Sequence, residues 1–342
     1  MGTVPEASGG EQAPIVAAEA APATPTSGLL VVDKPRGVTS HDIVAAARGA
    51  LHMKKVGHAG TLDPMSTGVL VVGFGNATRL LNHIVEHDKT YEATIRLGQS
   101  TTTDDADGEL LSATSPKRWQ ELLALPVAGG SQSAGENGPV NAAKGSAMAA
   151  AQVADDGSAY HPHQEAFLPD CQQLWRDRID DIIALQLTGS IEQVPNTFSA
   201  IKINGQRAYD LARDGKDVQL KARRITVSAF GVLDVRFGYA PTRQLGLPLV
   251  SAADGRATTE RDDAEATPVI DVDVRVSCSA GTYIRALGRD LGAALGVGGH
   301  LIRLRRTRVG GFDVSSPNVI TAHVETRVYT DRNGNHQSRN RA

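Results

Sequence analysis

The sequence predicts an α+β fold in which a mixed, largely antiparallel sheet is flanked by helices. Residues 91–97 and 270–278 alternate apolar and polar side chains, as half-buried strands do. Residues 284–295 instead carry leucines at helical spacing. Strands and helices are mixed without a strict strand–helix–strand rhythm, and this favours an antiparallel sheet over a doubly wound parallel one.

The remaining elements follow from shorter signals. Residues 29–32 form a short apolar strand, and residues 69–74 form a second strand that is apolar enough to be buried. Thr39 stands three residues before Asp42, the spacing of a capping box, so a helix is expected over the apolar run 43–51. Another helix is expected from Pro116, because proline is favoured in the first turn of a helix.

Composition limits the class of protein. The chain has 342 residues, enough to bury at least one sizeable core. Its apolar runs are far shorter than the ~20 residues that span a bilayer. A secretory signal begins with a basic segment, and no Lys or Arg precedes Lys34. The two cysteines, Cys171 and Cys278, give neither a disulfide framework nor a metal quartet. A reduced, cytoplasmic setting without a membrane anchor is therefore expected.

Charge and composition suggest the domain organisation. The net charge is −3, but three segments with little apolar content, 1–27, 128–166 and 241–267, each carry more acidic than basic residues. These segments are predicted to be a disordered tail and two flexible insertions, since they cannot offset the entropy of ordering their backbone. The remaining body, one domain over 28–310, is mildly basic and compatible with a nucleic-acid partner. Residues 311–342 are left as a short C-terminal remainder.

The sequence predicts neither a nucleotide cofactor nor a metal. No glycine-rich phosphate-binding pattern stands at a strand-to-helix turn, so no nucleotide cofactor is predicted. His83 and His87 are four residues apart but lack the glutamate and the third ligand of a zinc motif, so no metal is assigned.

The most informative stretch is residues 56–70. His58 stands between two glycines, and Asp63 precedes a proline in a loop that leads into the strand 69–74. A carboxylate on such a loop can project into a cleft. Asp also caps turns frequently, and on this local pattern alone that simpler interpretation is favoured.

The octapeptide GHAGTLDP at 57–64 resembles the catalytic motif of the TruB-type tRNA pseudouridine-55 synthase family. Further blocks resemble that family in the same order: LVVDKPRGVTS at 30–40, KTY at 89–91, LGQ at 97–99, DDADG at 104–108, PNTFSAIK at 195–202, GTYIR at 281–285 and HLIRLRR at 300–306. An ordered set across residues 29–310 is more specific than any single motif. It reverses the interpretation of Asp63 from a turn cap to a catalytic group.

The resemblance implies the pseudouridine synthase catalytic fold and the isomerisation of uridine 55, in the T-loop of tRNA, without a metal or an organic cofactor. In that reaction the base leaves C1′ through nitrogen, rotates and rejoins through carbon. Asp63 is implied as the group that drives it, as a nucleophile at C1′ or by promoting a glycal intermediate, and the sequence leaves both routes open. Arg285 is implied as the ion-pair partner that favours the charged carboxylate.

Other site residues are implied by the same resemblance. Flipping a uridine out of its stack costs a few kcal/mol, and stacking on Tyr91 supplies about 1–3 kcal/mol. Tyr283 is implied to close the pocket and assist proton transfer, Leu304 to pack beneath the site, and His58 to take the place of the flipped base. Without the family, Tyr91 would be an ordinary strand tyrosine and His58 a loop histidine bonded to backbone.

The expected RNA contacts are basic. Arg303, Arg305 and Arg306 stand close together without an acid among them, and Lys202 ends the block PNTFSAIK. Such clusters usually form a solvated surface, but beside an RNA-modifying motif contact with phosphates is the better interpretation. Asp105 is expected to hold Arg285 from behind.

Three functions are open at this point. The favoured one is a stand-alone, monomeric synthase that acts on the T-arm of tRNA without an obligatory protein partner. One alternative is an RNA-folding helper that clamps the T-arm. The other is a dyskerin-type synthase that works with guide RNA and protein partners. Bacterial relatives commonly carry a C-terminal RNA-binding domain, and residues 311–342 are too short for a complete one, so tRNA binding is expected to rest on the catalytic body.

Overall fold

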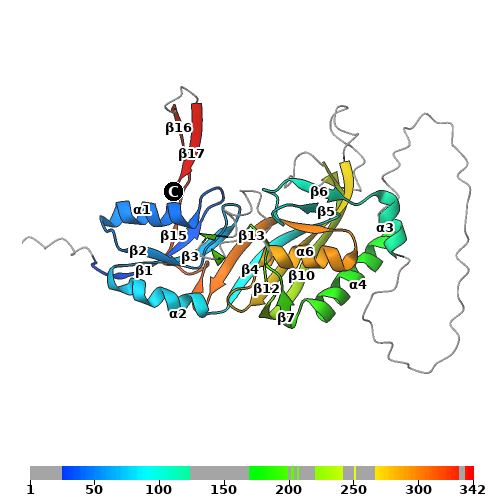
Figure 1. The fold of residues 1–342 in the computed structure, drawn as a ribbon, viewed down its shortest axis with the longest axis horizontal. Helices are drawn as coiled ribbons and strands as arrows, with labels where there is room; N and C mark the ends of the chain where they lie inside the picture. The colour runs from blue at the N-terminus through cyan, green and yellow to red at the C-terminus, as the bar shows by residue number, and fades with distance from the viewer. Residues whose placement is uncertain are drawn as a thin grey trace, which may run out of the picture.

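The computed structural model describes residues 25–123, 169–198, 202–203, 206–207, 220–241, 250–251, 266–330 and 336–342. An 11-stranded sheet runs along the long axis of the molecule (Figure 1). Its strands are β1 (Gly28–Lys34), β2 (Val56–Ala59), β3 (Thr67–Phe74), β4 (Lys89–Leu97), β7 (Gly189–Gln193), β10 (Arg223–Pro241), β11 (Val250–Ser251), β12 (Ala266–Cys278), β13 (Gly299–Val309), β14 (Phe312–Asp313) and β15 (Val319–Thr321).

Most neighbours in this sheet are antiparallel, and the order of its main path is β11-β10-β12-β4-β13-β3-β1-β15. Only β1 with β15 and β13 with β3 pair in parallel among the described strands. The predicted fold class is therefore confirmed. Three small two-stranded sheets complete the strands: β5 (Gln99–Thr101) with β6 (Leu110–Ala113), β8 (Lys202–Ile203) with β9 (Gln206–Arg207), and β16 (Glu325–Thr330) with β17 (His336–Arg341).

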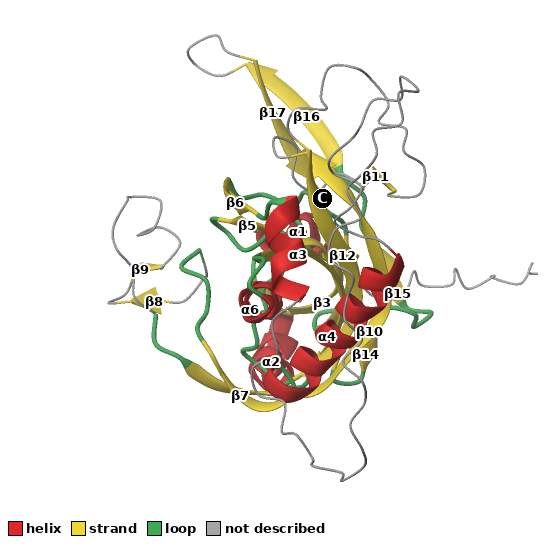
Figure 2. Cartoon of the chain, turned by 90° about the vertical axis from the view of Figure 1, so that its right-hand side faces the viewer, coloured by secondary structure: helices red, strands yellow, loops and turns green. Residues whose placement is uncertain are grey.

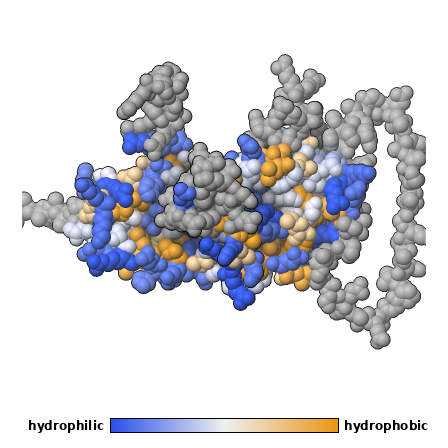
Figure 3. Space-filling model, in the orientation of Figure 1, coloured by the Kyte–Doolittle hydropathy of each residue, from blue (hydrophilic) through white to orange (hydrophobic). Residues whose placement is uncertain are grey.

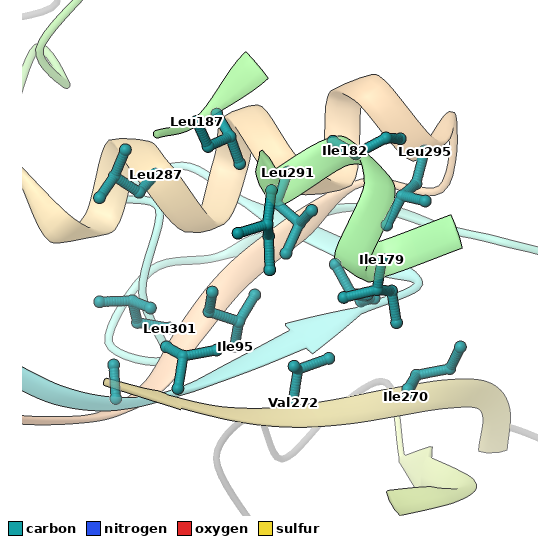
Figure 4. Packing of buried hydrophobic residues seen from close by; sticks show 14 of the residues in the cluster. Ile95, Ile179, Ile182, Leu187, Ile270, Val272, Leu287, Leu291, Leu295 and Leu301 are labelled. Carbon is teal, nitrogen blue, oxygen red and sulfur yellow. The ribbon is translucent and has the colours of Figure 1, made fainter. Parts of the chain in front are cut away.

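Helices pack on both faces of the sheet, which Figure 2 shows end on. They are α1 (Ser40–Leu51), the 3-10 turn η1 (Gly75–Leu80), α2 (Leu81–Glu86), α3 (Pro116–Leu123), α4 (Pro169–Gln186) and α6 (Ile284–Leu295). The largest core lies between α4, α6 and the sheet: in Figure 4, Leu287 and Leu291 of α6 and Ile179 of α4 face Ile95 of β4 and Val272 of β12. Each fully buried aliphatic side chain of this kind contributes about 1.5–3 kcal/mol.

Local signals located several elements correctly. Thr39 accepts a hydrogen bond from the Asp42 amide while the Asp42 carboxylate bonds back to Thr39, so the predicted capping box opens α1. The strands predicted over 91–97 and 270–278 lie within β4 and β12. The long strand β10 was not predicted, because two irregularities in its pairing with β12 interrupt the alternation that marks a strand.

The predicted tail and insertions fall largely outside the described residues: this holds for 1–24, for all of 128–166 and for most of 241–267. Beyond residue 310, β14 and β15 continue the main sheet. Within the described ranges, every helix is too short or too polar to cross a bilayer. Figure 3 shows one face of the molecule, on which hydrophilic residues are interrupted by small apolar patches.

A buried polar group lies within the sheet near the end of β4. The Arg96 guanidinium binds both carboxylate oxygens of Asp271 at 2.8 Å, and both side chains are buried. His300 is paired with Arg96 across β4 and β13, and its Nδ1 lies 3.1 Å from the Gln99 carbonyl. Burial lowers the pKa of His300 from 6.5 to about 4, and the nearby Arg96 charge acts in the same direction.

This shift predicts acid sensitivity. Below pH 6.5 the unfolded chain protonates His300, whereas the folded chain does not until about pH 4. The free energy of unfolding therefore decreases as pH falls through this window, by at most about 1.4 kcal/mol per unit from this one group. Urea denaturation at pH 6.5 and 4.5 should show a smaller difference for His300→Asn than for the wild type. Equal differences in the two proteins would contradict the assignment.

The packing of α6 against β13 can be tested at Gly292, with Gly49 of α1 as a control. A Cβ at Gly292 would lie 2.2 Å from backbone atoms of Gly298 and Gly299, so Gly292→Ala must push α6 away from the start of β13. We expect a loss of about 2 kcal/mol or more in the free energy of unfolding. Gly49, on the exposed side of α1, has nothing within 4 Å of its Cβ position. Gly49→Ala should add about 0.5–1 kcal/mol, and denaturant titrations of both variants measure the contrast.

Candidate active site

The loop that carries Asp63 is fixed by its neighbours. The Ser40 hydroxyl, in the first turn of α1, accepts from the Leu62 amide at 2.8 Å and donates to the Leu62 carbonyl at 3.1 Å. The Gly37 amide donates to the Pro64 carbonyl at 2.8 Å. Asp63 is therefore held between two anchored residues, and its side chain remains 38% exposed.

Arg306 of β13 fixes both ends of the same loop. Its buried guanidinium donates to the Gly60 carbonyl at 3.1 Å and to the Val69 carbonyl at 2.8 Å. Gly68 has a φ of +102°, and a Cβ there would lie 2.1 Å from the Arg306 carbonyl oxygen, so only glycine fits. We expected Arg306 to contact RNA phosphates at the surface, whereas the structure places its charge in the interior, against these carbonyls.

Arg285 connects Asp63 to the surrounding segments. Its Nε lies 3.1 Å from Asp63 Oδ2, and its Nη1 lies 3.2 Å from Asp105 Oδ2. Nη1 also donates to the Thr103 carbonyl at 2.9 Å, and Nη2 donates to the Phe198 carbonyl at 3.1 Å. The guanidinium side chain is only 8% exposed, so this cation is almost removed from water and fixed by four oxygens.

A cavity of about 310 Å³ opens beside the ion pair. Its walls include most of the residues expected at the site, which come from four separate parts of the chain: Asp63, Tyr91, Tyr283, Arg285, Leu304 and Arg306. Burial raises the pKa of the Tyr91 phenol, so this ring is neutral at physiological pH. The arrangement presents a carboxylate, a fixed cation and two aromatic rings to one enclosed space.

Gln193 of β7 is a site residue that the sequence reasoning missed. Its side-chain amide donates to the Tyr283 carbonyl at 3.0 Å and accepts from the Tyr283 amide at 2.8 Å. Gln193 is buried, and these two bonds fix the backbone of Tyr283, which occupies the N-cap position of α6. No local signal marks it, because the contact joins residues 90 positions apart.

Two buried lysines were also missed. Lys34 donates to the Val38 carbonyl at 2.6 Å, and burial lowers its pKa to about 8 although the Asp63 charge acts in the opposite direction. Lys89 lines the cavity and donates to the Val85 carbonyl at 2.7 Å, and burial lowers its pKa as well. Both belong to blocks that resemble the family, but nothing in those blocks distinguishes a buried lysine from an exposed one.

Other expected residues lie away from the cavity. His58 is in β2, outside the described lining, and burial lowers its pKa. Arg305 forms a bidentate ion pair with Asp33 at 2.7 and 3.0 Å, whereas Arg303 is 57% exposed and lies 3.9 Å from Glu92. Lys202 is in β8, and its side chain lies outside the described part of the structure.

Comparison with known proteins identifies the family. The model described as TruB family pseudouridylate synthase (N terminal domain) matches residues 48–125 and 150–244. A tRNA pseudouridine synthase B of Bifidobacterium longum (strain NCC 2705) is 52% identical over 336 residues, covering 93% of this chain and 76% of that protein. The chain belongs to the TruB family. A second model of this family, the tRNA pseudouridylate synthase B C-terminal domain, matches residues 285–339.

Other similarities are more distant. A tRNA pseudouridine synthase B of Streptomyces avermitilis is 43% identical over 289 residues, covering 84% of this chain and 70% of that protein. Among solved structures, a chain of a Cbf5-Nop10-Gar1 complex aligns with a TM-score of 0.46 and 24% identity. This alignment covers 87% of the present chain and about half, 53%, of the other.

The contact between Gln193 and Tyr283 gives a prediction. In Gln193→Glu the side chain can still accept from the Tyr283 amide but can no longer donate to its carbonyl. A buried acceptor left without a partner costs about 1–3 kcal/mol, and burying the new charge adds to that cost, so the free energy of unfolding should fall by at least that amount. Gln206→Glu makes the same chemical change at an exposed residue of β9 and should have little effect. Equal denaturation midpoints for the two variants would contradict this role of Gln193.

Proposed function

We propose that this chain converts uridine 55 in the T-loop of tRNA to pseudouridine. The observation that carries the proposal is the Asp63 carboxylate, held at 3.1 Å by a nearly buried Arg285 at the wall of a cavity with two tyrosines. Membership of the TruB family supports the same reaction. The reaction breaks the N1–C1′ bond, forms a C5–C1′ bond and transfers the hydrogen of C5 to solvent while N1 is protonated.

Asp63 is the group that acts on the ribose. Because Arg285 holds one of its oxygens, the carboxylate is kept in a fixed orientation. Its 38% exposure leaves it open to a nucleotide that enters the cavity. From this position it attacks C1′ as a nucleophile or removes a ribose proton on the glycal route, and both routes need the same charged oxygen.

The aromatic residues bind the extruded base. Tyr91 and Tyr283 line the same cavity as Asp63, and stacking of a base on an aromatic ring is worth about 1–3 kcal/mol. That is comparable with the few kcal/mol needed to unstack the uridine. Leu304 and the buried part of Arg306 close the base of the cavity, where they exclude water from the reacting atoms.

The substrate and setting complete the proposal. The proposed enzyme acts as a monomer on the T-arm of tRNA, without an obligatory protein partner. Arg303 is the exposed cation of the predicted cluster and is assigned to phosphate contact, and His58 to the RNA loop. The proposed setting is the cytoplasm, where tRNA is modified.

The decisive substitution is Asp63→Asn. It keeps the shape of the side chain but removes the negative charge, so pseudouridine formation on a T-arm transcript should become undetectable. Binding of the same RNA should change by less than about threefold, because the substituted group is not a phosphate contact. Chemical labelling of pseudouridine measures the first quantity and filter binding the second.

Asp107→Asn is the matched control, because Asp107 is exposed on the 104–108 turn, away from the cavity lining. This variant should keep the wild-type turnover. Turnover by Asp63→Asn at the wild-type rate would overturn the proposed function, and activity that depends on an added guide RNA would favour the dyskerin-type alternative.

A further inference from the structure

A second arginine on α6 contacts the two segments that Arg285 holds. Arg289 follows Arg285 by one helical turn, so both side chains leave the same face of α6. Its Nη1 lies 3.1 Å from Asp104 Oδ2, and its Nη2 donates to the Val194 carbonyl at 2.7 Å. Arg285 contacts the same pair of segments through Asp105 and the Phe198 carbonyl.

The backbone at Asp104 allows this double contact. Asp104 has a φ of +58°, and among the described residues other than glycine only His52 shares a positive φ. This conformation costs a non-glycine residue roughly 1–2 kcal/mol, although Asp tolerates it better than most. The resulting tight turn lets two consecutive carboxylates, those of Asp104 and Asp105, both reach arginines of α6.

The turn is also tied to the sheet below it. The Leu301 amide of β13 donates to the Asp104 carbonyl at 3.0 Å, and the Ala106 amide donates to the Leu301 carbonyl at 2.9 Å. The Asp104 side chain is only 7% exposed, and it also accepts a hydrogen bond from Asn196. Asp104 is therefore a buried junction between α6, β13 and the 194–198 segment.

We propose that Asp104 and Arg289 form a positioning pair for the reaction, an inference that rests on the proposed function. Neither residue lines the described cavity, so neither contacts a nucleotide bound in it. The pair fixes the 103–105 turn and the 194–198 segment relative to α6. This fixes Asp105, Thr103 and Phe198, the three partners that determine where Arg285 points, and hence where Asp63 is held.

The alternative is that this ion pair only stabilises the fold. Asp104→Gly separates the two roles, because glycine adopts a φ of +58° without strain while the carboxylate is lost. If the turn is purely structural, glycine preserves it and the variant keeps its activity. If the pair positions the site, loss of the contact between Asp104 and Arg289 lowers activity although the turn is preserved.

The experiment measures steady-state kinetics on a T-arm transcript for the full chain. For Asp104→Gly and Arg289→Gln we expect kcat to fall roughly 10- to 100-fold, the size of effect caused by a misplacement of about 1 Å. KM should stay within about threefold, because substrate contacts are intact. Arg289→Lys keeps the charge and should recover part of the loss, giving a kcat between those of the wild type and Arg289→Gln.

Asp290→Asn is the matched control. Asp290 also pairs with Arg289, at 2.8 Å, but it does not contact the 103–105 turn, so kcat should stay at the wild-type value. If Asp104→Gly fails to fold, as shown by its denaturation midpoint, Asp104→Asn replaces it with the same expected loss.

Wild-type kcat in the folded Asp104 variant, or a loss as large in Asp290→Asn, would overturn the positioning role while leaving the proposed function intact. Absence of pseudouridine formation by the wild-type chain itself would overturn both. These two failures are distinguished by including the wild type and Asp63→Asn in every assay.

Discussion

The guanidinium of Arg285 is the constraint on which the site depends. Removing an arginine from water is costly, and the cost is offset only where oxygens of good geometry surround the charge. Here two carboxylates and two backbone carbonyls surround it. Because one of these oxygens belongs to Asp63, the interactions that keep the cation buried also hold the reactive carboxylate in place. The start of α6 adds the positive end of a helix dipole at the same point.

The large sheet serves to bring distant segments to this cation. The Asp63 loop is held by α1 through Ser40 and by β13 through Arg306. Tyr91 comes from the central strand β4, which pairs with both β12 and β13. Groups on strands with two neighbours move little, and a reaction that needs a carboxylate at a fixed distance from one sugar carbon benefits from that rigidity.

The arginines of β13 show how one sequence cluster divides between two functions. Alternation along the strand sends Arg306 inward, where it holds the Gly60 and Val69 carbonyls, while Arg303 stays at the surface. Arg305 is partly neutralised by Asp33. A cluster that looks like one phosphate-binding patch in the sequence therefore contributes mainly to the architecture of the site, and electrostatic attraction of RNA rests on fewer exposed cations.

The sequence by itself determined the features that are encoded locally. The capping box of Thr39 and the alternation in β4 and β12 are each readable within a few residues, because periodicity and turn chemistry are local properties. The role of Asp63 was instead inferred from an ordered set of motifs across residues 29–310. Only the tertiary structure decided which charges are buried and which are paired. Gln193 beneath Tyr283, Arg306 beneath the loop and Asp104 against Arg289 join residues roughly 90 to 250 positions apart. Strand register and helix packing set such contacts, and no pattern along the chain records them.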